Sequence, residues 1–333
     1  MLYLPGLLLA ALIAVVARFI EGLLPIPFIS ASVIALFLGM MIHYFHPKND
    51  LIEPGVTFAS KRVLKLAIIL LGASLDINTI FHVGQLSIFV MFFTLLTCFG
   101  GGYLIGKALG LDWKLSNLIS AGTGICGGSA IAAIAPVIEA KPIDVAFAMS
   151  ATFIFDMFMI ILFPIMGRTL HLSDVAYGLW TGTAVNDTAS VVAAGYAYSE
   201  AAGDFATMVK LTRTLVIIPT VIIFALIHHR MKQREHHTEH RVQLNISKIF
   251  PLFILFFLLM SAARTVGWIP VHLAENLKWI SKFLMVTALG AIGLNTSLKE
   301  MKEVGHAPML HGLIVSILVI IVAISVEWLM GLV

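Results

Sequence analysis

The chain consists of long apolar segments separated by short polar ones, and this pattern predicts helices that cross a membrane. A helix needs about 20 apolar residues to span ~30 Å of hydrocarbon. About eleven segments approach this length, and their boundaries are good to a few residues. They cover 5–24, 27–46, 58–75, 86–108, 115–138, 143–167, 174–198, 205–228, 249–268, 279–296 and 309–331. We therefore expect an all-α polytopic membrane protein with about 10–11 transmembrane helices.

One polar stretch is long enough to divide the chain. Residues 229–248 contain several histidines and many charges, which favours an extended, solvated cytoplasmic linker. Weak metal binding by the histidines is the alternative interpretation. The linker separates an N-terminal transmembrane part, 1–228, from a C-terminal three-helix part, 249–333.

Composition agrees with a membrane location. Hydrophobic residues make up 59% of the chain, charged residues 12%, and the mean hydropathy is +0.99. A soluble domain is about 25% charged. The two cysteines, Cys98 and Cys126, lie in apolar segments without a CxxC motif, which argues against a disulfide framework or a zinc ribbon. We expect no cofactor and no bound metal.

Basic residues predict the orientation. Fourteen of the 21 lysines and arginines follow even-numbered segments, and positive loops favour the cytoplasm. This predicts a cytoplasmic N-terminus and an extracytoplasmic C-terminus. The N-terminal segment lacks a basic region and a small-residue cleavage site, so we interpret it as the first membrane helix and not as a signal peptide.

The stretch Ser120–Pro136 is too rich in glycine for a continuous helix. Its four glycines, at 122, 124, 127 and 128, each cost roughly 1 kcal/mol in a helix. A helix that breaks here would aim backbone N–H groups and its positive dipole end at a ligand, which suits an anion. Thr123 and Ser129 add hydroxyl groups beside Gly127 and Gly128. Close helix packing through small residues is the alternative.

A second group of polar residues lies in the segment 174–198. Asn186, Asp187 and Thr188 fall in its middle, where an ionised carboxylate costs at least a few kcal/mol. Asp187 is a candidate ligand for a proton or a cation, and its neighbours supply further oxygen atoms. Asp156, also deep in an apolar segment, is a second candidate coupling group. Either acid could instead pair with a buried base for structural reasons.

Two basic residues lie in the segment 205–228. Lys210 and Arg213 are three positions apart and share a helix face. They could coordinate an anion or pair with Asp187. Alternatively, they could extend their charged ends toward the membrane surface.

Internal similarities suggest repeats. The segments Leu71–Gly84 and Leu289–Gly305 resemble each other and lie on oppositely directed spans, as inverted repeats require. GGSAIAAIA, from Gly127, and NDTASVVAA, from Asn186, also resemble each other, but the span count makes them parallel. One segment could be re-entrant, the repeat could be permuted, or this similarity could be chance.

Several long strings carry a resemblance to a known family. They are SAGTGICGGSAIAAIAPVIEA, TGTAVNDTASVVAAGYAYS, MVKLTR and LGAIGLNTSLKEM. On these the whole chain resembles the YeiH-like sulfate exporter family of bacterial inner-membrane proteins. The resemblance implies a transporter with a fold similar to the bile-acid:sodium symporter and sodium-proton antiporter group. In that group two broken helices cross near the midplane and form the site.

The sequence thus predicts a secondary transporter of a small anion, sulfate-like or sulfonate-like by resemblance, coupled to H⁺ or Na⁺. The predicted substrate contacts are Thr123, Gly127, Gly128, Ser129, Lys210 and Arg213, and the predicted coupling contacts are Asn186, Asp187, Thr188 and Asp156. The alternatives are a passive anion channel and a transporter of an unrelated organic solute. No enzyme motif is present. Expected partners are the lipid bilayer, the anion and H⁺ or Na⁺. We expect no nucleic-acid partner, and a homodimer is a further option.

Overall fold

The computed structural model describes residues 3–23, 30–45, 51–234, 251–296 and 305–333. Over these ranges the regular structure is entirely helical. Six helical stretches are long and apolar enough to cross a membrane, and two shorter apolar helices accompany them. The multi-pass, all-α nature of the chain is therefore confirmed. The six stretches are Leu4–Leu23, Ile77–Ala108, Pro142–Thr169, Glu200–Met231, Val271–Leu294 and His306–Leu329.

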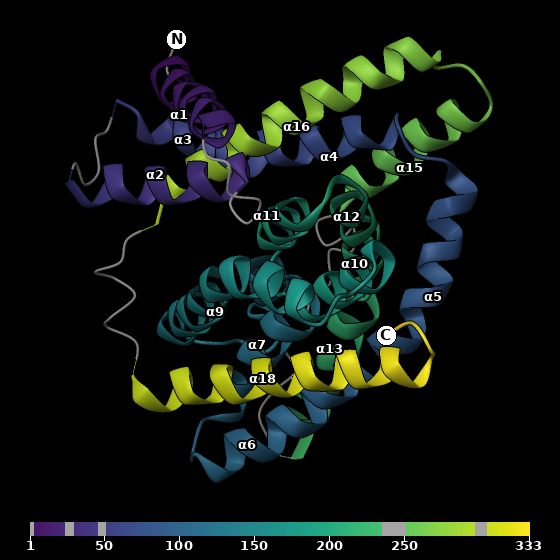
Figure 1. Cartoon of the computed structure of the whole chain (residues 1–333). Helices are drawn as coiled ribbons and strands as arrows, with labels where there is room; N and C mark the ends of the chain where they lie inside the picture. The colour runs from purple at the N-terminus through teal and green to yellow at the C-terminus, as the bar shows by residue number, and fades with distance from the viewer. Residues whose placement is uncertain (1–2, 24–29, 46–50, 235–250, 297–304) are drawn as a thin grey trace.

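The helices pack as two groups, which Figure 1 separates clearly. The first group contains α1 (Leu4–Leu23), α2 (Ala31–Phe45), α3 (Glu53–Phe58), α4 (Leu64–Gly72), α15 (Leu252–Thr265) and α16 (Val271–Leu294). A π-helical turn, Ala59–Val63, joins α3 to α4. The backbones of α2 and α16 approach closely, because a Cβ atom on Gly39 would lie 2.3 Å from the Gly290 carbonyl oxygen.

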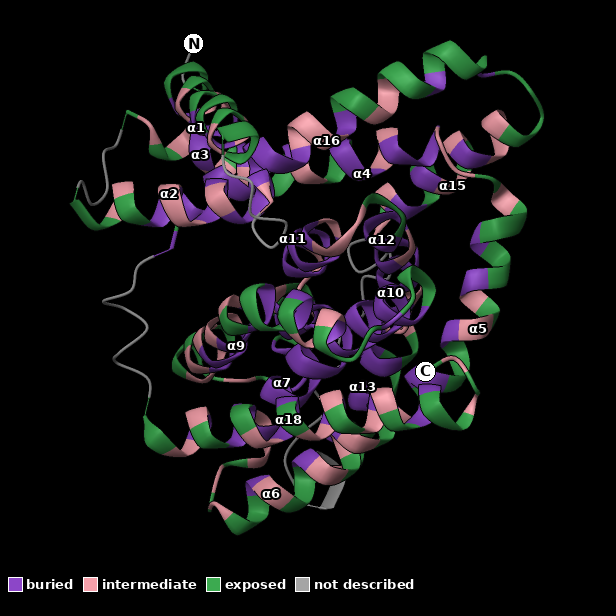
Figure 2. Ribbon diagram, in the orientation of Figure 1, coloured by how far each residue is buried: buried purple, intermediate pink, exposed green. Residues whose placement is uncertain are grey.

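The second group surrounds the polar residues. It contains α5 (Ile77–Leu96), α6 (Gly102–Ala108), α7 (Trp113–Ala121), α8 (Gly128–Ile134), α9 (Pro142–Thr169), α10 (Asp174–Ala184), α11 (Thr188–Tyr198), α12 (Glu200–Leu215), α13 (Ile217–Arg234) and α18 (His306–Leu329). π-Helical turns at Thr97–Gly101 and Gly122–Cys126 join α5 to α6 and extend α7. Figure 2 shows that α10, α11 and α12 are mostly buried.

The two groups do not follow the predicted division into 1–228 and 249–333. Helices α15 and α16 pack on α1, α2 and α4, whereas α18 packs on α5, α9 and α10. The polar loop therefore separates the chain in sequence and not in space. Helix α13 continues to Arg234, inside the predicted linker. Residues 235–248 of the linker lie outside the described residues.

The predicted span 115–138 is a re-entrant hairpin. Its two ends meet, because the ammonium of Lys114 donates to the Glu139 carbonyl oxygen at 2.9 Å. His228, near the end of α13, lies 3.8 Å from the Glu139 carboxylate. The chain from 113 to 126 is about 20 Å long at 1.5 Å per residue, so the turn at Gly127 lies deep in the bundle. This first hairpin, 113–139, enters and leaves at one end of the helix bundle.

The predicted span 174–198 is also a hairpin. The Ser199 hydroxyl donates to the Asp174 carboxylate at 2.6 Å, and the rings of Tyr177 and Tyr198 stack with centroids 3.9 Å apart. This second hairpin, 174–199, opens at the opposite end of the bundle, because α9 separates it from the first. Both segments that resemble each other therefore form hairpins, while the origin of their similarity stays a prediction. GGSAIAAIA and NDTASVVAA begin the two return arms, α8 and α11.

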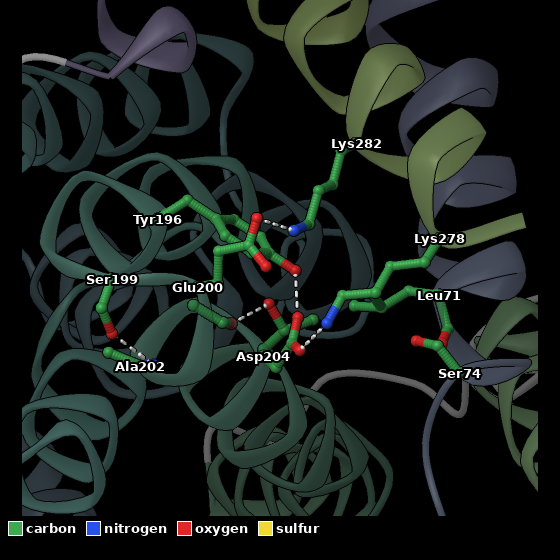
Figure 3. Close-up of polar contacts among 11 residues, drawn as sticks. Leu71, Ser74, Tyr196, Ser199, Glu200, Ala202, Asp204, Lys278 and Lys282 are labelled. Carbon is green, nitrogen blue, oxygen red and sulfur yellow. Dashed lines mark hydrogen bonds and ion pairs between the residues drawn. The ribbon is translucent and has the colours of Figure 1, made fainter. Parts of the chain in front are cut away.

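Ion pairs connect the two helix groups beside the second hairpin (Figure 3). On α16, Lys278 lies 2.6 Å from the Asp204 carboxylate and Lys282 lies 2.5 Å from that of Glu200. The Tyr196 hydroxyl donates to Asp204 at 2.6 Å. These contacts fix α16 against α11 and α12 with charged and hydroxyl groups. The predicted inverted repeats and symporter-like fold remain predictions.

Candidate functional site

The first hairpin turns at Gly127. The inward arm is α7 with its π-helical extension, which ends at Cys126, and α8 begins at Gly128. Gly127 has φ 62° and ψ −133°, a region that is essentially reserved for glycine. The predicted break within Ser120–Pro136 is therefore confirmed, and its turn falls at the third of the four glycines.

The second hairpin turns at Val185–Asp187. The backbone is extended at Val185 and at Asp187, and α11 begins at Thr188. The Asp187 carboxylate caps α11 by accepting the N–H of Ala189 at 2.8 Å. This polar turn accounts for the predicted cluster of Asn186, Asp187 and Thr188, because a break in a helix needs side chains that satisfy free backbone groups.

The two turns touch each other. A Cβ atom on Gly127 would lie 3.1 Å from both the Cβ and the Oδ1 of Asp187. Asp156, fully buried on α9, accepts the N–H groups of Asn186 at 3.0 Å and Asp187 at 3.1 Å. Asp156 therefore holds the second turn in place through both carboxylate oxygens. Three of the predicted coupling residues meet here.

Lys210 and Arg213 reach the same place from α12. Lys210 donates to the carbonyl oxygens of Ile125 at 2.8 Å and Val185 at 3.0 Å, and also to that of Asn186. Arg213 donates to the carbonyls of Gly124 at 2.7 Å and Val185 at 3.0 Å, and to that of Thr123. Both bases thus hold the carboxyl ends of both inward arms.

This arrangement gives the two bases structural partners in the backbone. Both side chains are fully buried, so neither extends to the membrane surface. Among the described residues, neither forms an ion pair with Asp156 or Asp187. Cations at helix carboxyl ends interact favourably with the negative end of the helix dipole. Here they also bind carbonyl groups that the helix breaks leave without intrahelical partners. Any effect on a bound anion would act through charge.

Two buried side chains at the turns have hydrogen-bonding atoms to spare. Asn186 is fully buried, and neither its amide oxygen nor its amide nitrogen has a partner in the described part of the chain. The Thr123 hydroxyl is also fully buried and has no partner among the residues that the structure describes. A buried amide without partners costs free energy, so these atoms are suited to bind a ligand or water.

The exposed part of the candidate site lies at the start of the two return arms. Ser129 is exposed, and Gly128, Asp187 and Thr188 are partly exposed. Irregular backbone at membrane depth is tolerated where it is buried in protein or lines a water-filled space. The exposed side of the two turns is therefore expected to face water. All ten predicted site residues lie at the two turns or in direct contact with them.

Comparisons with known proteins identify the family. A family model described as conserved hypothetical protein 698 matches residues 5–312. A UPF0324 membrane protein of Clostridium tetani (strain Massachusetts / E88) is 51% identical over 99% of this chain and 98% of its own length. A UPF0324 membrane protein of Streptococcus pneumoniae (strain R6) is 40% identical over 98% and 97% of the two chains. The chain belongs to the UPF0324 family of membrane proteins.

This UPF0324 protein also has buried polar residues on α18, outside the predicted site. His311 is fully buried, and its Nε2 lies 2.8 Å from the Gly102 carbonyl oxygen and 3.1 Å from the Ser116 hydroxyl. Glu327 is fully buried, and its carboxylate oxygens have no partner among the described residues. It lies two residues before the end of α18. His311 could have been noticed in the sequence, because a histidine is rare in so apolar a segment.

Proposed function

We propose that this UPF0324 protein is a secondary transporter of a small anion, coupled to H⁺ or Na⁺, and not an enzyme. The proposal rests mainly on one observation: the turns of two oppositely directed hairpins touch at Gly127 and Asp187, and the buried amide of the adjacent Asn186 has no partner among the described residues. Broken helices that present free backbone and side-chain groups at membrane depth are typical of transporter binding sites. A sulfate-like or sulfonate-like substrate follows only from the family resemblance.

The charges around the turns favour coupling. Asp156 and Asp187 carry two formal negative charges, and Lys210 and Arg213 carry two positive ones. A buried anion would leave this balanced group with an excess negative charge, which is costly in a low-dielectric site. A proton or Na⁺ taken up with the anion removes that excess. We assign the cation to Asp187 and Asp156, with oxygen atoms from Asn186 and Thr188.

The anion is assigned to the amino end of the first return arm. Gly127, Gly128 and Ser129 would offer backbone N–H and hydroxyl donors, and the Thr123 hydroxyl and Asn186 amide would add two more. Lys210 and Arg213 would stabilise the anion through charge while remaining bound to carbonyl groups. We further propose a bacterial inner-membrane location, with the open end of the first hairpin on the cytoplasmic side.

Ligand binding tests the assignment through thermal stability. We expect sulfate or methanesulfonate to raise the melting temperature of the purified protein, and the size of the shift to depend on pH or Na⁺. A ligand at 100 times its Kd adds about 2.7 kcal/mol to the free energy of unfolding. Asn186→Ala should abolish the shift, because it removes the unpartnered amide.

Asn117→Ala is the matched control. Asn117 lies near the base of the first hairpin, where its amide donates to the Trp113 carbonyl at 2.8 Å. This variant should respond to the anions as the native protein does. The assignment fails if Asn186→Ala retains the full shift, or if neither anion shifts the native protein under any of these conditions.

A further inference from the structure

Buried hydroxyl groups line the inward arm of the first hairpin. Ser116, Ser120 and Thr123 lie at positions i, i+4 and i+7, which places them on one helix face. Each of the three is at most 3% exposed. The row begins one helical turn after Trp113, at the open end of the hairpin, and ends at Thr123, about one helical turn before Gly127.

Two of these hydroxyls differ from other buried hydroxyls in the chain. In apolar helices a serine or threonine usually donates to a carbonyl three or four residues earlier. Ser87, Thr94 and Thr152 do so here, at 2.9, 3.1 and 2.7 Å. Ser120 and Thr123 do not, and their hydroxyl groups are unpartnered in the described part of the chain. Their hydrogen-bonding capacity is therefore free for another group.

His311 stands at the outer end of the row. It lies on α18, five residues after the helix begins, and contacts Ser116 at 3.1 Å. One turn further in, the Ser120 hydroxyl points at α6, because a Cβ atom on Gly102 would lie only 2.1 Å from it. The absence of a side chain at Gly102 therefore leaves room for that hydroxyl. The described residues place no carboxylate within ion-pair distance of His311.

We propose that this row is a proton path from the open end of the first hairpin to the proposed site. Protons would pass from His311 to Ser116, and then along Ser120 and Thr123, with water molecules bridging the gaps between hydroxyls. The inner end, Thr123, lies about one helical turn before Gly127, which contacts Asp187. The free hydroxyls and the histidine can both accept and donate a proton, which the surrounding apolar side chains cannot. The proposal deepens the proposed function, since it names H⁺ as the coupled ion and assigns its route.

Isotope exchange of a thiol tests the path without any transport assay. Ser120→Cys introduces an S–H group whose infrared stretching band shifts when the protein is moved into D₂O. Subtracting the spectrum of the native protein removes the bands of Cys98 and Cys126. Ser87→Cys is the matched control, because Ser87 is equally buried but bonded to the Gly84 carbonyl. We expect S–H exchange in Ser120→Cys to be at least about tenfold faster.

Equal exchange rates in the two variants would overturn the proposal. A melting temperature close to that of the native protein confirms that each variant is folded before its rate is compared. Fast exchange at position 120 in a protein that shows no anion-dependent ion movement would support the path and contradict the proposed function. Anion-dependent proton movement with equally slow exchange at positions 120 and 87 would support the proposed function and contradict the path.

Discussion

Gly127→Ala is expected to lower the free energy of unfolding by about 1–3 kcal/mol and to abolish anion binding. The backbone of Gly127 lies at φ 62° and ψ −133°, which alanine rarely adopts. Its new Cβ atom would also lie 3.1 Å from the Cβ and Oδ1 of Asp187. The substitution therefore strains the first turn and pushes the second away from it. Thermal unfolding in detergent measures the first effect, and the anion-induced shift measures the second.

Gly128→Ala provides the control at the neighbouring position. The nearest atom to a new Cβ there is the Met149 methyl carbon, 4.0 Å away, so the change needs no rearrangement. We expect the free energy of unfolding to change by no more than about 0.5 kcal/mol. If the two variants melt at the same temperature, the turn is not where the structure puts it.

Arg213→Met is expected to destabilise the protein by about 3–5 kcal/mol, because three buried carbonyl groups lose a charged donor and each unsatisfied group costs about 1–3 kcal/mol. The guanidinium donates to carbonyls of both inward arms, at Thr123, Gly124 and Val185. Methionine fills part of the space but donates nothing, so these carbonyls lose a partner in an apolar interior. The measurement is the melting temperature, together with the yield of monodisperse protein.

Two further variants isolate the cause. Arg213→Lys keeps the charge but loses the planar guanidinium group. Its melting temperature should fall between that of Arg213→Met and that of the native protein. Arg230→Met changes the same residue type at an exposed position on α13 and should have little effect. An Arg213→Met variant as stable as Arg230→Met would mean that the carbonyl ends of the hairpins do not depend on this base.

The local chemistry of the site could be predicted from the sequence. Glycine density predicted a break within Ser120–Pro136, and mid-segment polar residues marked the stretch Asn186–Thr188, where the structure has its second turn. Both follow from the cost of exposed backbone and of charge at membrane depth, which depends on residue type alone. The same reasoning identified Asp156, Lys210 and Arg213, although it could not determine what they bind.

The path of the chain could not be predicted in the same way. Two half-helices of an apolar hairpin contain as many apolar residues as one crossing helix, so hydropathy cannot separate them. A hairpin differs from a crossing helix in contacts between its ends, such as Lys114 with Glu139 and Ser199 with Asp174. These contacts form only in the folded chain. Similarly, the burial of Glu327 near the end of α18 depends on how that helix packs.

The coupling of ion movement to anion movement at Asp187 is the central claim. The most direct test uses the protein in liposomes that contain a pH-sensitive and a Na⁺-sensitive dye, with sulfate or methanesulfonate added outside. We predict anion-dependent movement of H⁺ or Na⁺ that is lost in Asp187→Asn and retained in Asp144→Asn, at the first turn of α9. Movement of equal size in Asp187→Asn and in the native protein would contradict the account.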